Sequence, residues 1–241
     1  MRYNALIFDI DKTLIDLEAS LEETLLRTFD YFDCDVDEGV LLTYHSIFAQ
    51  VDRLHVQGQL AHGDILYTVL DNFLRVLDGL DLPIDEFKDV FMGFYCQTVV
   101  LMPGARRVLR KLSRFYPIYC ASNANRDMQE LRLHYSGLLP YMQDIFTPGE
   151  LECEKPNLKF FKECSIRIGL PPGDILFIGD SLTEDIHPAL SFGMATMWFN
   201  PDNQNTKRKQ PTFIIDNLHK MMLLLAGWNF EQMPKSNYNN F

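Results

Sequence analysis

Short hydrophobic runs alternate with amphipathic stretches along most of the chain, a pattern that predicts an α/β fold. The runs are continuous rather than alternating, which is typical of parallel strands buried on both faces. They lie at residues 5–9, 117–122, 144–148, 174–180, 195–199 and 212–216. Amphipathic segments, most of them ended by Gly or Pro, predict helices at 104–115, 125–137, 158–169 and 184–193. We therefore expect a Rossmann-like, doubly wound parallel sheet covered by helices.

The segment 16–99 departs from this alternation and keeps a helical period of apolar residues. Near its start, Ser20 is followed three residues later by Glu23, a spacing that predicts a capping box with Ser20 as N-cap. Further helical patterns follow near 40–57, 62–77 and 85–98. We therefore expect an all-helical cap domain at 16–99, inserted into a catalytic core made of residues 1–15 and 100–241.

Composition and charge narrow the classes of function. The 241 residues carry a formal net charge of −11 and scattered basic residues, so we expect a small substrate rather than a nucleic acid polymer. Five cysteines without CxxC spacing, in a chain of this size, indicate reduced thiols. The sequence has no evident secretory signal or membrane span, so we expect a cytoplasmic protein. We expect it to be a monomer or a homodimer.

Polar residues follow the predicted strands, at the edge of the sheet where ligands of α/β proteins bind. They are Asp9, Asp11 and Thr13; Ser122 and Asn123; Lys155; and Asp180 and Asp185. Clustered carboxylates repel one another and raise each other's pKa unless a cation lies among them. Oxygen ligands alone favour a hard cation, Mg²⁺. A carboxylate nucleophile, a hydroxyl, an ammonium and Mg²⁺ together suit a phosphoryl group.

We expect four of these residues to take part in catalysis. Asp9 would attack phosphorus and form an aspartyl phosphate, which divides a difficult hydrolysis into two easier displacements. Asp11 would protonate the leaving oxygen and then take a proton from the attacking water. Ser122 and Lys155 would hold the equatorial phosphoryl oxygens, where charge spreads in the transition state.

The remaining residues would bind the cation or the substrate. Asp9, the backbone carbonyl of Asp11 and Asp180 would hold Mg²⁺. Asp185 would act from an outer position, orienting Lys155 or a metal-bound water. The predicted substrate-binding residues are Thr13, Ser122, Asn123 and Lys155.

Simpler interpretations stay open for three residues. Ser122 could satisfy the backbone of a turn, Lys155 could be an ordinary solvated lysine, and Asp185 could be a charge at a helix N-terminus. For Asp9 and Asp11 a purely structural role is disfavoured, because two carboxylates at the edge of a core are costly without a cation.

Four segments, in this order, resemble the motifs of the haloacid-dehalogenase-like (HAD) hydrolase superfamily: FDIDKTL, SNAN, EKPN and GDSLTEDI. The helical insert after the first motif resembles the C1 cap of that superfamily. Dehalogenases typically lack the second aspartate of the first motif, so the presence of Asp11 implies the phosphatase branch. The resemblance thus implies a Mg²⁺-dependent phosphomonoesterase acting on a small phosphorylated metabolite.

A narrower resemblance concerns the substrate. The segments FDIDKTLIDLEAS, GDSLTEDI and WFNPDNQN are similar to those of pyrimidine 5′-nucleotidases that act on non-standard nucleotides. This likeness implies a nucleoside 5′-monophosphate as the substrate. Two residues depart from the superfamily pattern. Lys12 stands where Gly is frequent, and His187 with Pro188 stands where small residues are usual.

Other functions stay open at this point. Within the same fold, the chain could be a sugar-phosphate phosphatase or a phosphomutase, in which Asp11 would return the phosphoryl group to a sugar. From another class, GDSL at 179–182 with DNLH at 216–219 matches a GDSL-type serine esterase whose triad would be Ser181, Asp216 and His219. The position of Ser181 late in the chain opposes that esterase. A binding module with a degenerate site is opposed because every catalytic position is filled.

Overall fold

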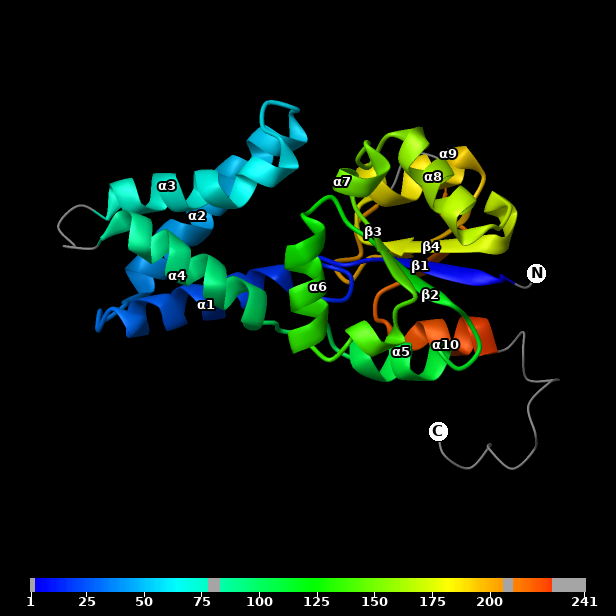
Figure 1. Cartoon of the computed structure of the whole chain (residues 1–241), viewed down its shortest axis with the longest axis horizontal. Helices are drawn as coiled ribbons and strands as arrows, with labels where there is room; N and C mark the ends of the chain where they lie inside the picture. The colour runs from blue at the N-terminus through cyan, green and yellow to red at the C-terminus, as the bar shows by residue number, and fades with distance from the viewer. Residues whose placement is uncertain (1–2, 78–82, 206–209, 227–241) are drawn as a thin grey trace. The chain divides into compact units, whose positions relative to one another are not determined.

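The computed structural model describes residues 3–77, 83–205 and 210–226. Within these residues the chain forms two compact units, both visible in Figure 1. The first unit comprises the described residues of 1–15, 101–122 and 138–241, and the second comprises those of 16–100 and 123–137. The segment 123–137, which the sequence assigns to the core, lies with the helices in this division.

Six parallel strands form the sheet of the first unit, in the order β3-β2-β1-β4-β5-β6, which confirms the predicted fold class. Their bounds are β1 (Ala5–Asp9), β2 (Ile118–Ala121), β3 (Asp144–Phe146), β4 (Ile175–Gly179), β5 (Ala195–Phe199) and β6 (Phe213–Ile215). Every residue of β1 and β4 is buried. Burial on both faces explains why the sequence shows continuous rather than alternating hydrophobic runs.

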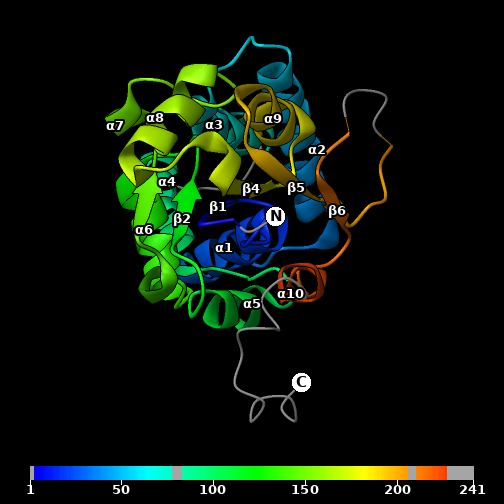
Figure 2. The ribbon, with the colours of Figure 1, turned by 90° about the vertical axis from the view of Figure 1, so that its right-hand side faces the viewer.

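Helices cover both faces of this sheet, as Figure 2 shows. Helices α5 and α10 lie side by side on one face, and α8 and α9 lie on the other. On the second face, Phe160 and Phe161 of α8 pack with Ile7 of β1 and Phe177 of β4. The helices of this unit are α5 (Ala105–Leu112), α7 (Pro148–Leu151), α8 (Leu158–Ile168), α9 (His187–Phe192) and α10 (His219–Ala226), with 3₁₀ turns at Leu139–Tyr141 and Pro172–Asp174.

Strand β1 lies at the topological switch point of the sheet. It pairs with β2 on one side and with β4 on the other, so the chain reverses its direction of winding here. Asp9 is in register with Ala121, and Ala121 with Phe146. The residues that follow these strands therefore leave the sheet at one edge, where open α/β sheets bind their ligands.

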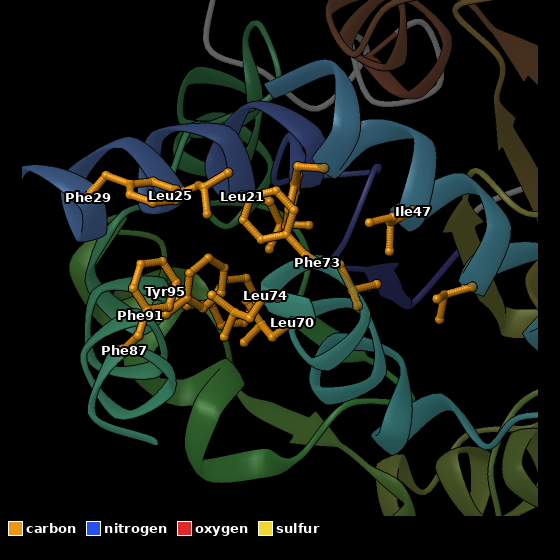
Figure 3. Close-up of a cluster of buried hydrophobic side chains, with 13 residues drawn as sticks. Leu21, Leu25, Phe29, Ile47, Leu70, Phe73, Leu74, Phe87, Phe91 and Tyr95 are labelled. Carbon is orange, nitrogen blue, oxygen red and sulfur yellow. The ribbon is translucent and has the colours of Figure 1, made fainter. Parts of the chain in front are cut away.

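In the described residues of the second unit, helices joined by turns are the regular secondary structure, and the unit has a core of its own. Figure 3 shows this core, in which Phe73 is fully buried. The ring of Phe73 meets those of Tyr44 and Phe29 edge-on, with centroid distances of 5.2 and 6.3 Å. The elements are α1 (Leu17–Tyr31), α2 (Glu38–Val56), a 3₁₀ turn (His62–Asp64), α3 (Ile65–Val76), α4 (Ile84–Gln97) and α6 (Arg126–Tyr135).

Helix α1 begins before the predicted cap. The carboxylate of Asp16 accepts a hydrogen bond from the Ala19 amide at 3.1 Å, so Asp16 is the N-cap. Ser20 lies inside the helix, where its hydroxyl donates to the Asp16 carbonyl at 2.6 Å and accepts from the Val100 amide at 3.0 Å. The prediction of a capping box at Ser20 is therefore wrong. The serine instead joins the two ends of the segment 16–100.

The predicted helix at 184–193 is also not continuous. A π-helical turn covers Leu182–Ile186, and α9 begins only at His187. Pro188 has no amide proton to donate to the preceding turn, and a regular α-helix cannot run through that point without losing a hydrogen bond. Short π-helical turns are frequent at functional sites.

The buried ring of Phe73 allows a test of the helical unit. We expect Phe73→Ala to lower the free energy of unfolding by about 3–5 kcal/mol, because it removes a fully buried aromatic side chain. Leu42→Ala is the control, because Leu42 is 69% exposed and its loss should change stability by no more than about 0.5 kcal/mol. Urea denaturation followed by circular dichroism measures both values, and equal losses would contradict the described core.

Candidate active site

Asp9 closes β1 at the switch point and is almost completely buried, with 6% of its surface exposed. Its Oδ1 accepts a hydrogen bond from Nζ of Lys155 at 2.6 Å. Its Oδ2 is buried and has no hydrogen-bond partner among the described residues. Burial and the charges of Asp185 and Asp180 raise the pKa of Asp9 well above the ordinary value, although Lys155 opposes the rise. One oxygen of this carboxylate is held, and the other is left for a ligand.

Lys155 is the cation of the site and is only 3% exposed. Its ammonium bridges two carboxylates, Asp9 at 2.6 Å and Asp185 at 2.7 Å, and also lies 3.4 Å from the carbonyl of Ala121. Burial opposes the charge, but the two carboxylates outweigh it and raise the pKa of the lysine, so it stays protonated. The interpretation of Lys155 as an ordinary solvated lysine is therefore wrong.

Asp180 and Asp185 complete an acidic cluster with Asp9. One carboxylate oxygen of each lies within 4.8 Å of the others. Burial and the charge of Asp185 raise the pKa of Asp180 to about 7, and burial likewise raises the pKa of Asp185. Three carboxylates, two of them buried and that of Asp180 half-buried, face one buried ammonium, so the fully ionised cluster is short of positive charge. The uncompensated Asp9 Oδ2 and the all-oxygen donor set fit a hard divalent cation such as Mg²⁺.

Asp185 is held on both carboxylate oxygens. Its Oδ1 accepts from Lys155 at 2.7 Å, and its Oδ2 accepts from the Ser181 amide at 3.2 Å. The π-helical turn makes this possible, because the amides of Asp185 and Ile186 both donate to the Ser181 carbonyl at 3.1 Å. With both oxygens engaged by protein groups, Asp185 suits the predicted outer position better than direct ligation.

Gly179 leaves the space that Asp185 occupies. A Cβ atom at this position would lie 2.4 Å from Oδ2 and 2.7 Å from Cβ of Asp185. Sequence reasoning missed this glycine as a functional residue. Its place directly before Asp180, at the end of a strand, was the only available signal, because glycines in strands often mark a close approach.

The turn after β1 carries two more predicted site residues, Asp11 and Thr13, on either side of Lys12. Lys12 adopts the left-handed backbone conformation, with φ of 62°, at the position where the superfamily often has Gly. This conformation costs a lysine about 1–2 kcal/mol. The turn is closed by hydrogen bonds from the Lys12 amide to the Ile15 carbonyl at 2.7 Å and from the Leu14 amide to the Ile10 carbonyl at 2.8 Å.

Asp11 and Thr13 flank Lys12 in this turn. Asp11 is partly exposed and lies two residues after Asp9, and its catalytic role stays a prediction. Thr13 is fully buried, and its hydroxyl lies 3.4 Å from Oδ1 of Asp180 as a hydrogen-bond donor. This hydroxyl is placed to orient Asp180, and the contact with substrate predicted for Thr13 stays a prediction.

Ser122 follows β2 and is 3% exposed. Its amide donates to the Phe146 carbonyl at 3.0 Å, which extends the pairing of β2 and β3 by one residue. It lies one residue beyond Ala121, the register partner of Asp9. Asn123 is also buried and begins the segment 123–137 of the helical unit. Their substrate contacts stay predictions.

The serine esterase triad is not assembled in the described part of the chain, where no hydrogen bond joins its three members. Ser181 Oγ caps the π-helical turn by accepting from the Glu184 amide at 3.1 Å. Asp216 pairs with Lys220 at 2.7 Å. The ring of His219 packs against Gly104, where an added Cβ would lie 2.4 Å from its Cε1. Each of the three residues serves local structure.

Comparison with known proteins identifies the class. Residues 3–193 match the model of the haloacid dehalogenase-like hydrolases. The chain therefore belongs to this hydrolase family, which confirms both the resemblance stated above and the prediction that the protein is an enzyme, a hydrolase.

Two relatives named as pyrimidine 5′-nucleotidases are similar over most of their length. PynA of Streptococcus pneumoniae is 29% identical over 88% of this chain and 91% of its own. YjjG of Escherichia coli is 23% identical over 94% of this chain and 99% of its own.

The HAD-hydrolase YfnB of Bacillus subtilis is similar in both sequence and structure. The sequences are 27% identical over 93% of this chain and 96% of YfnB. A crystal structure of YfnB, described as bound to magnesium, superposes with a TM-score of 0.82 over 93% of this chain and 99% of that chain. The L-2-haloacid dehalogenase of Xanthobacter autotrophicus, at 17% identity, TM-score 0.70 and coverage of 93% and 99%, shares the fold alone.

Gly179 offers a test of the site's packing. We expect Gly179→Ala to lower the free energy of unfolding by about 1–3 kcal/mol, because the added methyl group overlaps Asp185. Gly173→Ala is the matched control, since nothing lies within 4 Å of a Cβ there. Urea denaturation of both variants measures the difference. Equal stability of the two variants would contradict the described contact between Gly179 and Asp185.

Proposed function

We propose that the protein is a Mg²⁺-dependent phosphomonoesterase that acts through an aspartyl phosphate on Asp9, with a nucleoside 5′-monophosphate as its substrate. The observation that carries the proposal is the state of the Asp9 carboxylate. It is buried, held on Oδ1 by Lys155 at 2.6 Å, and unpartnered on Oδ2 among the described residues. A carboxylate fixed in this way is oriented for attack and lacks competing hydrogen bonds on one oxygen.

The reaction would proceed in two displacements. Asp9 attacks phosphorus, and the bond to the ester oxygen of the leaving group breaks while Asp11 gives that oxygen a proton. Asp11 then takes a proton from water, which attacks the aspartyl phosphate and releases inorganic phosphate. Lys155 and Ser122 hold the phosphoryl oxygens, and the ammonium of Lys155 reduces the repulsion between Asp9 and an anionic substrate.

Asp9, Asp180 and the backbone carbonyl of Asp11 would hold Mg²⁺. The ion, when bound, supplies the positive charge that an anionic nucleophile and an anionic phosphate need in order to meet. Asp185 would fix Lys155 and thereby the orientation of Asp9. The charge deficit of the cluster, three carboxylates against one ammonium, supports a cation at this place.

Asp11 supports a phosphatase over a dehalogenase. A halide needs no protonation when it leaves, whereas an alkoxide does, so a second carboxylate two residues after the nucleophile favours an ester substrate. The names of PynA and YjjG support a nucleotide as that ester. The substrate would be a small phosphorylated metabolite and not a nucleic acid polymer. A sugar phosphate, or a phosphomutase reaction with one, is the alternative within this fold.

The segment 16–99 would act as a C1 cap over a core of residues 1–15 and 100–241, excluding water and selecting the leaving group. The cytoplasm is the proposed location. Its support is the free state of all five cysteines in the structure. No helix in the described part of the chain is long and apolar enough to cross a bilayer. The enzyme would be a monomer or a homodimer.

Phosphate release tests the proposed activity. A panel of nucleoside monophosphates, sugar phosphates and p-nitrophenyl phosphate is assayed with Mg²⁺ and with EDTA, and a 2-haloacid is assayed for halide release. We expect Mg²⁺-dependent phosphate release with a preference for pyrimidine nucleotides, and a loss of at least about 10³-fold in Asp9→Asn. Asp174→Asn, at the amino end of β4, is the control and should keep full activity. Release that survives in Asp9→Asn, or halide release alone, would contradict the proposal.

The pKa of Asp180 predicts how Mg²⁺ binding depends on pH. The pKa of Asp180 is about 7 in the folded protein, against an ordinary value of 3.8. Between these pH values the folded protein holds a proton that the unfolded chain has lost, so the free energy of unfolding falls as the pH rises. Mg²⁺ favours the ionised form, so the rise in Tm caused by Mg²⁺ should be larger at about pH 8 than at about pH 6. Differential scanning fluorimetry measures this rise in Tm. The Asp180→Asn variant should lose the difference between the two pH values. Equal Tm shifts at both pH values in the wild type would contradict the prediction.

A further inference from the structure

We propose that Trp198 is a positioning residue for the Mg²⁺ ligand Asp180, and that its indole N–H sets the affinity of the metal site. The inference rests on the function proposed above, because it takes Asp180 as a ligand of Mg²⁺. It adds a residue that lies outside the four motifs and that comes from a different strand, β5 (Ala195–Phe199).

The contact is specific. Trp198 is the register partner of Gly179, the last residue of β4, and its Nε1 donates to the backbone carbonyl of Asp180 at 2.8 Å. Trp198 is only 2% exposed, so its indole is almost wholly removed from solvent. A buried indole N–H requires an acceptor, and here the acceptor is the backbone of the ligand residue itself. The strand β4 ends at Gly179, so the indole holds the first carbonyl beyond the strand.

A second hydrogen bond fixes the other end of the same residue. The hydroxyl of Thr13 lies 3.4 Å from Oδ1 of Asp180, from the turn after β1. The backbone of Asp180 is thus held from β5 and its carboxylate from the turn after β1. A ligand that is already ordered loses less conformational freedom when the ion binds, which increases affinity.

A purely structural role for Trp198 makes a different prediction. As one of the largest buried side chains it contributes to the core, and any truncation will lower stability. A structural residue would change the free energy of unfolding without changing Mg²⁺ affinity in the folded protein. A positioning residue changes the affinity itself, and the two roles therefore separate when binding is measured below the unfolding transition.

The test measures Mg²⁺ binding to the full chain by isothermal titration calorimetry and, independently, the Mg²⁺ concentration that gives half-maximal phosphate release. We expect Trp198→Phe to raise the Kd for Mg²⁺ by about 10-fold or more, and turnover to recover largely when Mg²⁺ is saturating. Phe199→Leu is the matched control, because it removes buried aromatic surface from the next position of β5 and leaves the indole N–H of Trp198 in place. Its Kd should stay within about 2-fold of the wild-type value.

An isosteric replacement covers the case in which Trp198→Phe does not fold. Incorporation of 3-benzothienylalanine at position 198 replaces the N–H group by sulfur and keeps the shape of the ring. We expect the same rise of about 10-fold in the Kd for Mg²⁺, because only the hydrogen-bond donor is lost.

The outcomes distinguish this inference from the function on which it rests. A wild-type Kd retained in the isosteric variant overturns the role of Trp198 and leaves the phosphatase proposal standing. A wild-type protein that binds no Mg²⁺ overturns both. Weaker binding in Trp198→Phe and in the isosteric variant, with normal binding in Phe199→Leu, supports the inference.

Discussion

The ammonium of Lys155, buried between the carboxylates of Asp9 and Asp185 at 2.6 and 2.7 Å, is the contact on which the rest of the site depends. It connects the end of β1, the loop after β3 and the turn after β4 through one charge. Removing the ammonium would leave the buried carboxylates without a counter-charge, which would lower the free energy of unfolding by several kcal/mol. Because Asp180 adds a third carboxylate, even an intact lysine leaves the cluster negative. This shortage of positive charge opposes folding, and it also gives the cluster affinity for a cation.

Much of this arrangement could be predicted from the sequence, because it depends on strand ends. Continuous hydrophobic runs located the six strands of the described sheet, and the residues that end these strands or directly follow them include Asp9, Ser122 and Asp180. In a parallel sheet these ends meet at one edge, so their convergence follows from topology alone. Lys155 was also identified, and a contact with Asp185 was among the expectations, although an ordinary solvated position for this lysine had stayed open.

What the sequence could not predict are contacts made by side chains of ordinary type across long separations. The hydroxyl of Thr13 donates to the carboxylate of Asp180, 167 residues further along the chain. The sequence indicates only that Trp198 belongs to a strand, whereas in the structure its indole donates to the Asp180 carbonyl. A local signal was also misleading. Ser20 has a side chain suited to an N-cap, but the N-cap of α1 is Asp16. The turn at Lys12 keeps its left-handed backbone without glycine, which no propensity would predict.

The most direct test of the account is to trap the covalent intermediate on Asp9. The enzyme is mixed with Mg²⁺ and a good phosphate ester, quenched with borohydride, which reduces an acyl phosphate to an alcohol, and analysed by peptide mass spectrometry. The account predicts that Asp9 is converted to homoserine, that conversion requires both the ester and Mg²⁺, and that Asp180 and Asp185 are unchanged. Conversion at another aspartate, or turnover of the ester without conversion at Asp9, would contradict it.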